Sequence, residues 1–197
     1  MARLEVITGP MFSGKTEELI RRLRRATFAR KRILVVRPST DNRGTRSIFD
    51  LIKGDDKLSC YECLASRVLN HVKELRSLVD SWKPDILAID EAQFFGPELL
   101  EYLDELLEKK KSKNFTIIVA GLDMDAWRRP FGTMPQLLAM ADEVLKLTAI
   151  CVACNGENPA IFTQKKGGTG KQVEVGDTGL YEARCRACYY VPGQGPA

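Results

Sequence analysis

The segment Gly9–Thr16 fits the pattern G-x-x-x-x-G-K-[ST], which binds the phosphates of nucleoside triphosphates. Glycines let successive backbone N–H groups point at phosphate oxygens, and a helix that begins near Lys15 adds the positive end of its dipole. In this chemistry Lys15 reaches the β- and γ-phosphates, and the hydroxyl of Thr16 ligates Mg²⁺. The candidate residues are Gly9, Pro10, Met11, Phe12, Ser13, Gly14, Lys15 and Thr16. The alternative is a glycine-rich turn that carries an ordinary exposed lysine.

Two acidic residues, Asp90 and Glu91, follow the apolar run Ile86–Ile89. An acid at the end of a buried strand is the expected second half of such a site, where Asp90 holds Mg²⁺ through its water shell. Glu91 is expected to face the other way and to be free to act as a base. A motor ATPase uses such a base on water, whereas a kinase uses it on a substrate hydroxyl. The alternative is a pair of surface acids that cap a helix starting near Pro97.

Four cysteines form two CxxC pairs with 30 residues between them: Cys151 with Cys154, and Cys185 with Cys188. In a reducing compartment this spacing indicates a structural zinc site with four thiolate ligands. Such a site stabilises folding locally, so it can clamp the base of the long glycine-rich segment between the pairs. The alternative is a redox-active disulfide.

Each of the other residues that could do chemistry allows a structural interpretation as well as a functional one. Cys60 and Cys63 could be a redox pair or a metal half-site, although small apolar fillers are commoner. His71 is the only histidine, which excludes His-rich metal sites, and it lies in a helical pattern, which favours a surface or half-buried imidazole. The basic residues between 21 and 32 form either the solvated face of a helix or a nucleic-acid track. Residues 128–131 follow a strand and favour ligand contact.

The elements that must position these residues alternate along the chain. Strands are expected over Leu4–Thr8, Arg32–Arg37, Asp85–Asp90, Phe115–Leu122 and Val144–Leu147, and helices over Thr16–Arg30, Ala65–Trp82, Pro97–Lys111 and Met134–Ala141. The stretch Ser39–Ser59 is polar and has little periodicity. Continuous apolar strands separated by helices predict an α/β fold, with a mainly parallel sheet covered by helices. We therefore expect a P-loop nucleotide-binding core over residues 1–149 and a small zinc-binding domain over residues 150–197.

The composition is that of an ordinary globular protein. Of 197 residues, 44% are hydrophobic and 28% are charged, which argues against wholesale disorder, collagen and coiled coil. The net charge of +4 is too small to imply a nucleic-acid partner. No apolar stretch reaches the roughly 18–20 residues of a membrane helix, and the N-terminus has no apolar core of a signal peptide. These patterns predict a soluble, intracellular protein with reduced cysteines.

In combination, these motifs closely resemble the zinc-containing, cytosolic type (type II) of thymidine kinase. The resemblance covers about residues 3–190 and rests on Gly9–Thr16, Asp90–Phe95, Leu122-Asp123, Pro130-Phe131-Gly132 and the two CxxC pairs. It implies a core related to recombinase-type ATPases and a zinc domain whose lasso loop closes over the nucleoside. The implied reaction transfers the γ-phosphate of ATP to the 5′-hydroxyl of thymidine, a step of pyrimidine deoxynucleoside salvage.

The resemblance also implies a role for particular residues. Glu91 is implied as the base that takes the proton from the thymidine 5′-hydroxyl. ATP and Mg²⁺ are implied to bind at the segment Gly9–Thr16 together with Arg43, Asp90 and Gln93. The implied thymidine contacts are Met11, Phe94, Leu122, Phe131, Thr163, Val173, Val175, Gly176 and Tyr181. The four paired cysteines are implied to hold a structural Zn²⁺. The family further implies a cytoplasmic homotetramer that is inhibited by thymidine triphosphate and has no nucleic-acid or membrane partner.

The sequence departs from the family pattern at three places. Ala126, followed by Trp127, stands where family members often carry an aromatic residue against the nucleoside. Leu51–Gly54 replaces the usual Ser-His-x-Gly, and Gly176-Asp177 replaces a Gly-Gly in the lasso.

Two other classes of function fit parts of the pattern. A zinc-ribbon, DNA-dependent ATPase would use the phosphate loop, the acid pair and the basic residues 21–32. A zinc-ribbon binding module would carry a vestigial nucleotide site. Strong stimulation of ATP hydrolysis by single-stranded DNA would favour the ATPase, and ATP binding without turnover would favour the module.

Overall fold

Six parallel strands form the central sheet in the computed structural model, which describes residues 1–40, 48–59, 61–167 and 179–194. The strands are β1 (Arg3–Thr8), β2 (Ile33–Pro38), β3 (Leu64–Leu69), β4 (Ile86–Ile89), β5 (Thr116–Gly121) and β6 (Glu143–Lys146). Their order across the sheet is β3-β2-β4-β5-β1-β6, and each neighbouring pair is parallel. The predicted α/β fold with a mainly parallel sheet is confirmed.

The inner strands are mostly apolar on both sides because both faces of the sheet are buried there, whereas the edge strands β3 and β6 are partly exposed. In β2, Leu34 and Val36 pack into one core cluster, while Ile33 and Val35 pack into the other. All four side chains are fully buried. This alternation explains why the strands read in the sequence as continuous apolar runs.

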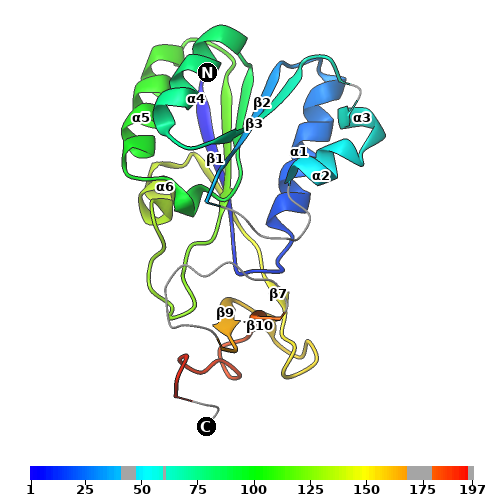
Figure 1. The fold of residues 1–197 in the computed structure, drawn as a ribbon, viewed down its shortest axis with the longest axis vertical. Coiled ribbons are helices and arrows are strands. Elements are labelled where there is room, and N and C mark those ends of the chain that lie inside the picture. The colour runs from blue at the N-terminus through cyan, green and yellow to red at the C-terminus, as the bar shows by residue number, and fades with distance from the viewer. Residues whose placement is uncertain (41–47, 60, 168–178, 195–197) are drawn as a thin grey trace.

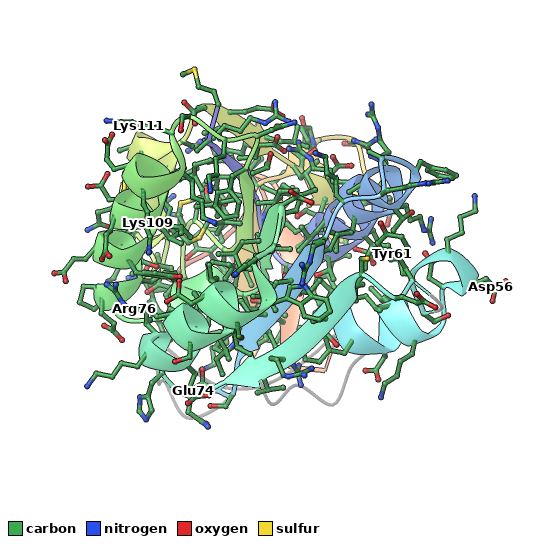
Figure 2. The ribbon with its side chains drawn as sticks, turned by 90° about the horizontal axis from the view of Figure 1, so that it is seen from above. Asp56, Tyr61, Glu74, Arg76, Lys109 and Lys111 are labelled. Atoms are coloured by element: carbon green, nitrogen blue, oxygen red, sulfur yellow. The ribbon has the colours of Figure 1, made fainter. Side chains whose placement is uncertain are left out.

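Two sets of helices cover the two faces (Figure 1). One set consists of α1 (Lys15–Phe28), α2 (Ile48–Lys53) and α3 (Asp56–Ser59), and the other of α4 (Val72–Trp82), α5 (Glu98–Lys110) and α6 (Met134–Met140). From above, the sets lie on opposite sides of the sheet, with Arg76 on one side and Asp56 on the other (Figure 2). Arg76 of α4 forms an ion pair of 2.7 Å with Glu105 of α5, which joins two neighbouring helices.

Two predictions about the elements were wrong or incomplete. The helix expected over Ala65–Trp82 is instead the edge strand β3 followed by α4, which begins after His71. Leu64–Leu69 becomes a strand because β2 pairs with it along its whole length, a partner that local periodicity does not reveal. The polar stretch Ser39–Ser59 contains the short helices α2 and α3, which bury Ile48, Ile52 and Leu58 against α1 and the sheet.

A small C-terminal lobe, which we define as residues 149–167 and 179–194, lies below the carboxyl ends of the strands (Figure 1). Its strands form two antiparallel pairs, β7 (Ala149–Ile150) with β8 (Pro159–Ala160) and β9 (Phe162–Lys165) with β10 (Tyr181–Arg184). Among the described residues, no helix has both the length and the apolar character needed to cross a bilayer.

Candidate active site

The phosphate loop connects β1 to α1 in a backbone shape that requires glycine. Gly9 has φ 142°, and a Cβ atom there would lie 2.4 Å from the carbonyl oxygen of Leu147. Gly14 has φ 82° and directly precedes α1. The side chains of Ser13 and Lys15 both donate hydrogen bonds to the carbonyl oxygen of Pro10, at 2.8 and 2.7 Å. The loop therefore has the form that presents backbone N–H groups and a lysine to phosphate oxygens.

The acid pair lies at the carboxyl end of β4, and its two members have different partners. Asp90 accepts a hydrogen bond of 3.5 Å from the hydroxyl of Thr16, so β4 and the phosphate loop meet at this point. The hydroxyl of Thr16 and the carboxylate of Asp90 both offer oxygen atoms, the ligands that Mg²⁺ prefers in proteins, so these two side chains are chemically suited to the ion.

Glu91 is buried and occupies the left-handed backbone region, with φ 55° and ψ 44°. This conformation is rare for residues other than glycine and turns the chain from β4 into the 3₁₀ helix η1 (Ala92–Phe94). The side-chain amide of Gln93 donates a hydrogen bond to Oε2 of Glu91. Oε1 of the same Gln93 side chain accepts a hydrogen bond of 3.0 Å from the backbone N–H of Leu122.

An apolar cluster, which we call the nucleoside cluster, lies beside these groups. Its members are Met11, Leu122, Ala126, Phe131 and Tyr181, with Phe94, Trp127 and Leu180 packed against them. Phe94 and Phe131 meet edge to face, with 5.7 Å between ring centroids. Five residues that the family resemblance implies for thymidine, contributed by four different chain segments, are therefore brought together: Met11, Phe94, Leu122, Phe131 and Tyr181.

Thr163 of β9 joins the C-terminal lobe to the phosphate loop. Its hydroxyl accepts a hydrogen bond of 3.0 Å from the backbone N–H of Met11, and both groups are buried. The other implied site residues, Arg43, Val173, Val175 and Gly176, lie outside the described residues, as does Cys60.

The loop after β5 is organised by an acid that the sequence reasoning missed. Oδ1 of Asp125 accepts hydrogen bonds of 2.9 Å from the backbone N–H groups of both Trp127 and Arg129. Ala126 is itself a buried member of the nucleoside cluster, and Trp127 packs against that cluster. Asp side chains often accept hydrogen bonds from backbone N–H groups shortly after them, so an Asp in a loop is a turn signal that could have been read from the sequence.

Arg128 connects this loop to the C-terminal lobe. Its guanidinium carbon lies 5.4 Å from the ring centroid of Phe162 and 5.3 Å from that of Tyr189. The hydroxyl of Tyr189 donates a hydrogen bond of 2.7 Å to the carbonyl oxygen of Ala126. The sequence predicted ligand contact for this segment, but it carried no signal for these aromatic partners because they are distant in the chain.

The four paired cysteines come together in the C-terminal lobe. Their sulfur atoms all lie within 4.8 Å of one another, and Sγ of Cys154 is 3.9 Å from Sγ of Cys185. Zn²⁺ bonded tetrahedrally to four sulfurs at 2.3 Å separates them by about 3.8 Å, so the cluster fits that ion. Burial opposes ionisation of Cys151, but hydrogen bonds with the backbone around Cys185 and Cys154 lower its pKa to about 6. The pKa of Cys188 is instead raised to about 12, mainly by its hydrogen bond with Cys185, so the fit of the cluster to zinc rests on the geometry of its four sulfurs.

The interpretation of His71 as a surface imidazole agrees with the structure, whereas the interpretation of the Cys60–Cys63 pair stays a prediction because Cys60 lies outside the described residues. Cys63 is a half-buried free cysteine that does not belong to the four-cysteine cluster. His71 is exposed and directly precedes α4.

Comparison with known proteins agrees with this geometry. A sequence model of the family described as "Thymidine kinase" matches residues 2–189. A thymidine kinase of Bacteroides thetaiotaomicron is 42% identical over 187 residues, which cover 95% of this chain and 86% of the relative. A thymidine kinase of Coprothermobacter proteolyticus is 43% identical, with 97% of this chain and 92% of the relative covered. One of Mycoplasma mobile is 40% identical, with 94% and 86% covered.

Proposed function

This chain belongs to the thymidine kinase family, and from that premise we infer that it transfers the γ-phosphoryl group of ATP to the 5′-hydroxyl of thymidine. One observation carries the inference beyond the family name. Two consecutive carboxylates connect the two halves of the site: Asp90 bonds to Thr16 of the phosphate loop, and Glu91 is linked through Gln93 to the nucleoside cluster. A base beside both a triphosphate site and an apolar cluster suits a kinase whose acceptor carries a hydrophobic ring.

On the ATP side, backbone N–H groups of the loop between Phe12 and Thr16 and the ammonium of Lys15 bind the phosphate oxygens, while the N–H of Met11 stays bonded to Thr163. Thr16 and Asp90 would hold Mg²⁺, which when bound neutralises negative charge on the β- and γ-phosphates. Arg43 is proposed to support the phosphoryl group during transfer.

Glu91 is the proposed catalytic base. Its carboxylate accepts the proton of the 5′-hydroxyl as that oxygen forms a bond to the γ-phosphorus. The bond between the γ-phosphorus and the bridging oxygen breaks, and ADP leaves with that electron pair. The products are thymidine monophosphate, ADP and a proton held on Glu91.

On the thymidine side, Met11, Phe94, Leu122, Phe131 and Tyr181 enclose the base, and Thr163 holds the adjoining backbone of the phosphate loop. Val173, Val175 and Gly176 are proposed to close over the nucleoside with main-chain groups. A competitor with the wrong pattern of donors and acceptors leaves such groups unpaired, at a cost of about 1–3 kcal/mol each. Closure also excludes water, which suppresses wasteful ATP hydrolysis.

The proposal extends to the organisation of the protein. We propose a P-loop core over residues 1–149 and a zinc-binding domain over residues 150–197, in which Cys151, Cys154, Cys185 and Cys188 hold Zn²⁺. We further propose a cytoplasmic homotetramer that is inhibited by thymidine triphosphate, as the family resemblance implies.

Within the part of the chain that the structure describes, three of the four arginines of α1 are paired with carboxylates, which favours a kinase over a DNA-dependent ATPase. Arg21 pairs with Glu18, Arg22 pairs with Glu5, Glu18 and Glu143, and Arg24 pairs with Asp55. Arginines that are held by carboxylates are poorly placed to neutralise a nucleic-acid backbone.

The test is to incubate the metallated protein with ATP, Mg²⁺ and a panel of deoxynucleosides. We expect thymidine monophosphate to form, with Glu91→Gln lowering kcat by about 10²- to 10⁴-fold while ATP binding is kept. Glu101→Gln, which makes the same chemical change on the exposed face of α5, is the matched control. Failure with every nucleoside, or hydrolysis of ATP that depends on single-stranded DNA, would overturn the proposal.

A further inference from the structure

The side chain of Gln93 bridges two parts of the site that different chain segments contribute. Its amide nitrogen donates to Oε2 of Glu91, and its Oε1 accepts from the backbone N–H of Leu122 at 3.0 Å. Gln93 is 3% exposed, so neither hydrogen bond is made at the water surface. Leu122 follows β5 and belongs to the nucleoside cluster. The bridge thus joins the proposed base, Glu91, to the nucleoside cluster.

The orientation of the amide follows from chemistry alone. A backbone N–H can only donate, so the oxygen end of Gln93 must face Leu122. The NH₂ end must then face Glu91, whose carboxylate oxygen accepts. The bridge therefore suits an ionised carboxylate, which is the form a base needs.

The surrounding chain leaves little room around Gln93. A Cβ atom at Gly121 would lie 2.7 Å from Oε1 of the Gln93 side chain, and one at Gly132 would lie 2.1 Å from the backbone carbonyl oxygen of Gln93. The hydroxyl of Thr133 donates to the carbonyl oxygen of Ala92 at 3.2 Å, which holds the start of η1. Two glycines thus make room for Gln93 where β4, β5 and α6 converge.

We propose that Gln93 is a positioning residue that holds the Glu91 carboxylate where it can accept the proton of the nucleoside 5′-hydroxyl. This inference rests on the proposed function, because it concerns the base of that reaction. It differs from the family resemblance, which implied Gln93 on the ATP side. Gln93 acts through Glu91 and transfers no proton in the reaction.

Two variants separate the two hydrogen bonds. Gln93→Glu keeps an acceptor for Leu122 but replaces the donor facing Glu91 by a second carboxylate, and Gln93→Leu removes both bonds. We expect each to lower kcat for thymidine by about 100-fold, the scale on which a misplaced catalytic group costs rate. We expect KM for ATP to stay within about twofold, because the interaction serves the transition state and not ATP binding. Thermal unfolding and direct ATP binding show whether each variant is folded.

A double-mutant cycle with Glu91→Gln tests whether Gln93 acts through the base. In that background we expect Gln93→Leu to lower the residual kcat by less than about threefold, because there is no carboxylate left to position. An equal loss in both backgrounds would overturn the inference. A raised KM for ATP with kcat unchanged would also overturn it and return Gln93 to the ATP side. Absence of thymidine phosphorylation by the unsubstituted protein would instead refute the proposed function.

Discussion

At the residue scale, unusual backbone conformations gather where the phosphate loop, the acid pair and the loop after β5 meet. Gly9, Phe12, Gly14, Glu91 and Gly132 all have positive φ. Glycine adopts such conformations at little cost, so only Phe12 and Glu91 are strained. Strained residues of this kind cluster at active sites, and these two lie in the phosphate loop and at the proposed base.

Gly9→Ala tests this argument at one position. The added Cβ combines a forbidden φ with a clash of 2.4 Å against Leu147, so we expect a loss of about 1–3 kcal/mol in the free energy of unfolding, together with weaker ATP binding. Gly167→Ala is the matched control, because a Cβ there meets nothing within 4 Å, and we expect a change below about 0.5 kcal/mol. Urea unfolding and calorimetric titration with ATP provide the two measurements. Equal stabilities for the two variants would contradict the argument.

At the element scale, ion pairs attach α1 to the sheet. Arg22 reaches Glu18 on its own helix at 3.0 Å, Glu5 on β1 and Glu143 on β6 at 3.0 Å. Arg21 binds Glu18 through two nitrogens, at 2.6 and 2.8 Å. These contacts set the helix that follows the phosphate loop against the strand that precedes it, so the loop is held from both ends.

The carboxyl of Glu18 predicts a pH dependence of stability. Hydrogen bonds from Arg21, and then from Arg22, outweigh burial and lower its pKa from 4.5 to about 2. Because the folded pKa is the lower one, this contribution to stability is complete above about pH 4.5 and disappears as pH falls toward 2. We expect the difference in unfolding free energy between the unsubstituted protein and Glu18→Gln to shrink over that window.

Chemical unfolding at several pH values between 2 and 7 measures this difference. Acid affects the C-terminal lobe equally in both proteins, so that effect cancels when the two unfolding free energies are subtracted. Glu17→Gln is the control, because Glu17 lies on the same turn, is exposed and has no ion pair among the described residues. A difference that stays constant from pH 2 to 7 would show that the pairs with Glu18 do not stabilise the fold.

At the scale of the whole molecule, the site forms where the C-terminal lobe meets the core (Figure 1). Thr163 bonds to the phosphate loop, Tyr181 enters the nucleoside cluster, and Tyr189 bonds to the loop after β5. All three residues belong to a lobe with only short strands, and the four-cysteine cluster lies within it. The order of the lobe is therefore expected to control the thymidine side of the site more than the ATP side.

Loss of the metal should separate these two sides. A four-cysteine site holds about one zinc ion per chain, and we expect Cys151→Ser to lower the zinc content below that value. Thymidine phosphorylation should fall with it, while ATP binding falls less, because the phosphate loop lies between β1 and α1 of the core and the lobe supports it through the hydrogen bond from Met11 to Thr163. Cys63→Ser is the matched control, since that half-buried cysteine is outside the cluster. Zinc analysis, ATP titration and limited proteolysis of the lobe give the measurements, and full thymidine turnover in metal-free protein would contradict the expectation.

Much of the fold and of the site could be predicted from local sequence. Gly9, Gly14 and Lys15 were recognisable because a phosphate loop needs those residue types at that spacing. The cysteines were recognisable because two CxxC pairs are the typical ligand spacing of a structural zinc site. Strand β3 was missed because its hydrogen bonds come from β2, and the helices α2 and α3 were missed because their few apolar residues acquire meaning only against α1.

The sequence by itself determined the chemistry that is available: a phosphate loop, an acid pair after a buried strand and four thiols. Each of these is a short pattern whose physics is local. Only the tertiary structure decided that the oxygen of Gln93 faces Leu122 while its amide faces Glu91, and that Arg128 lies against Phe162 and Tyr189. Those contacts join segments that the chain separates by up to 61 residues, so they depend on how the strands are ordered and how the lobe packs. No local pattern encodes such an arrangement, because its energy arises only when the distant partners meet.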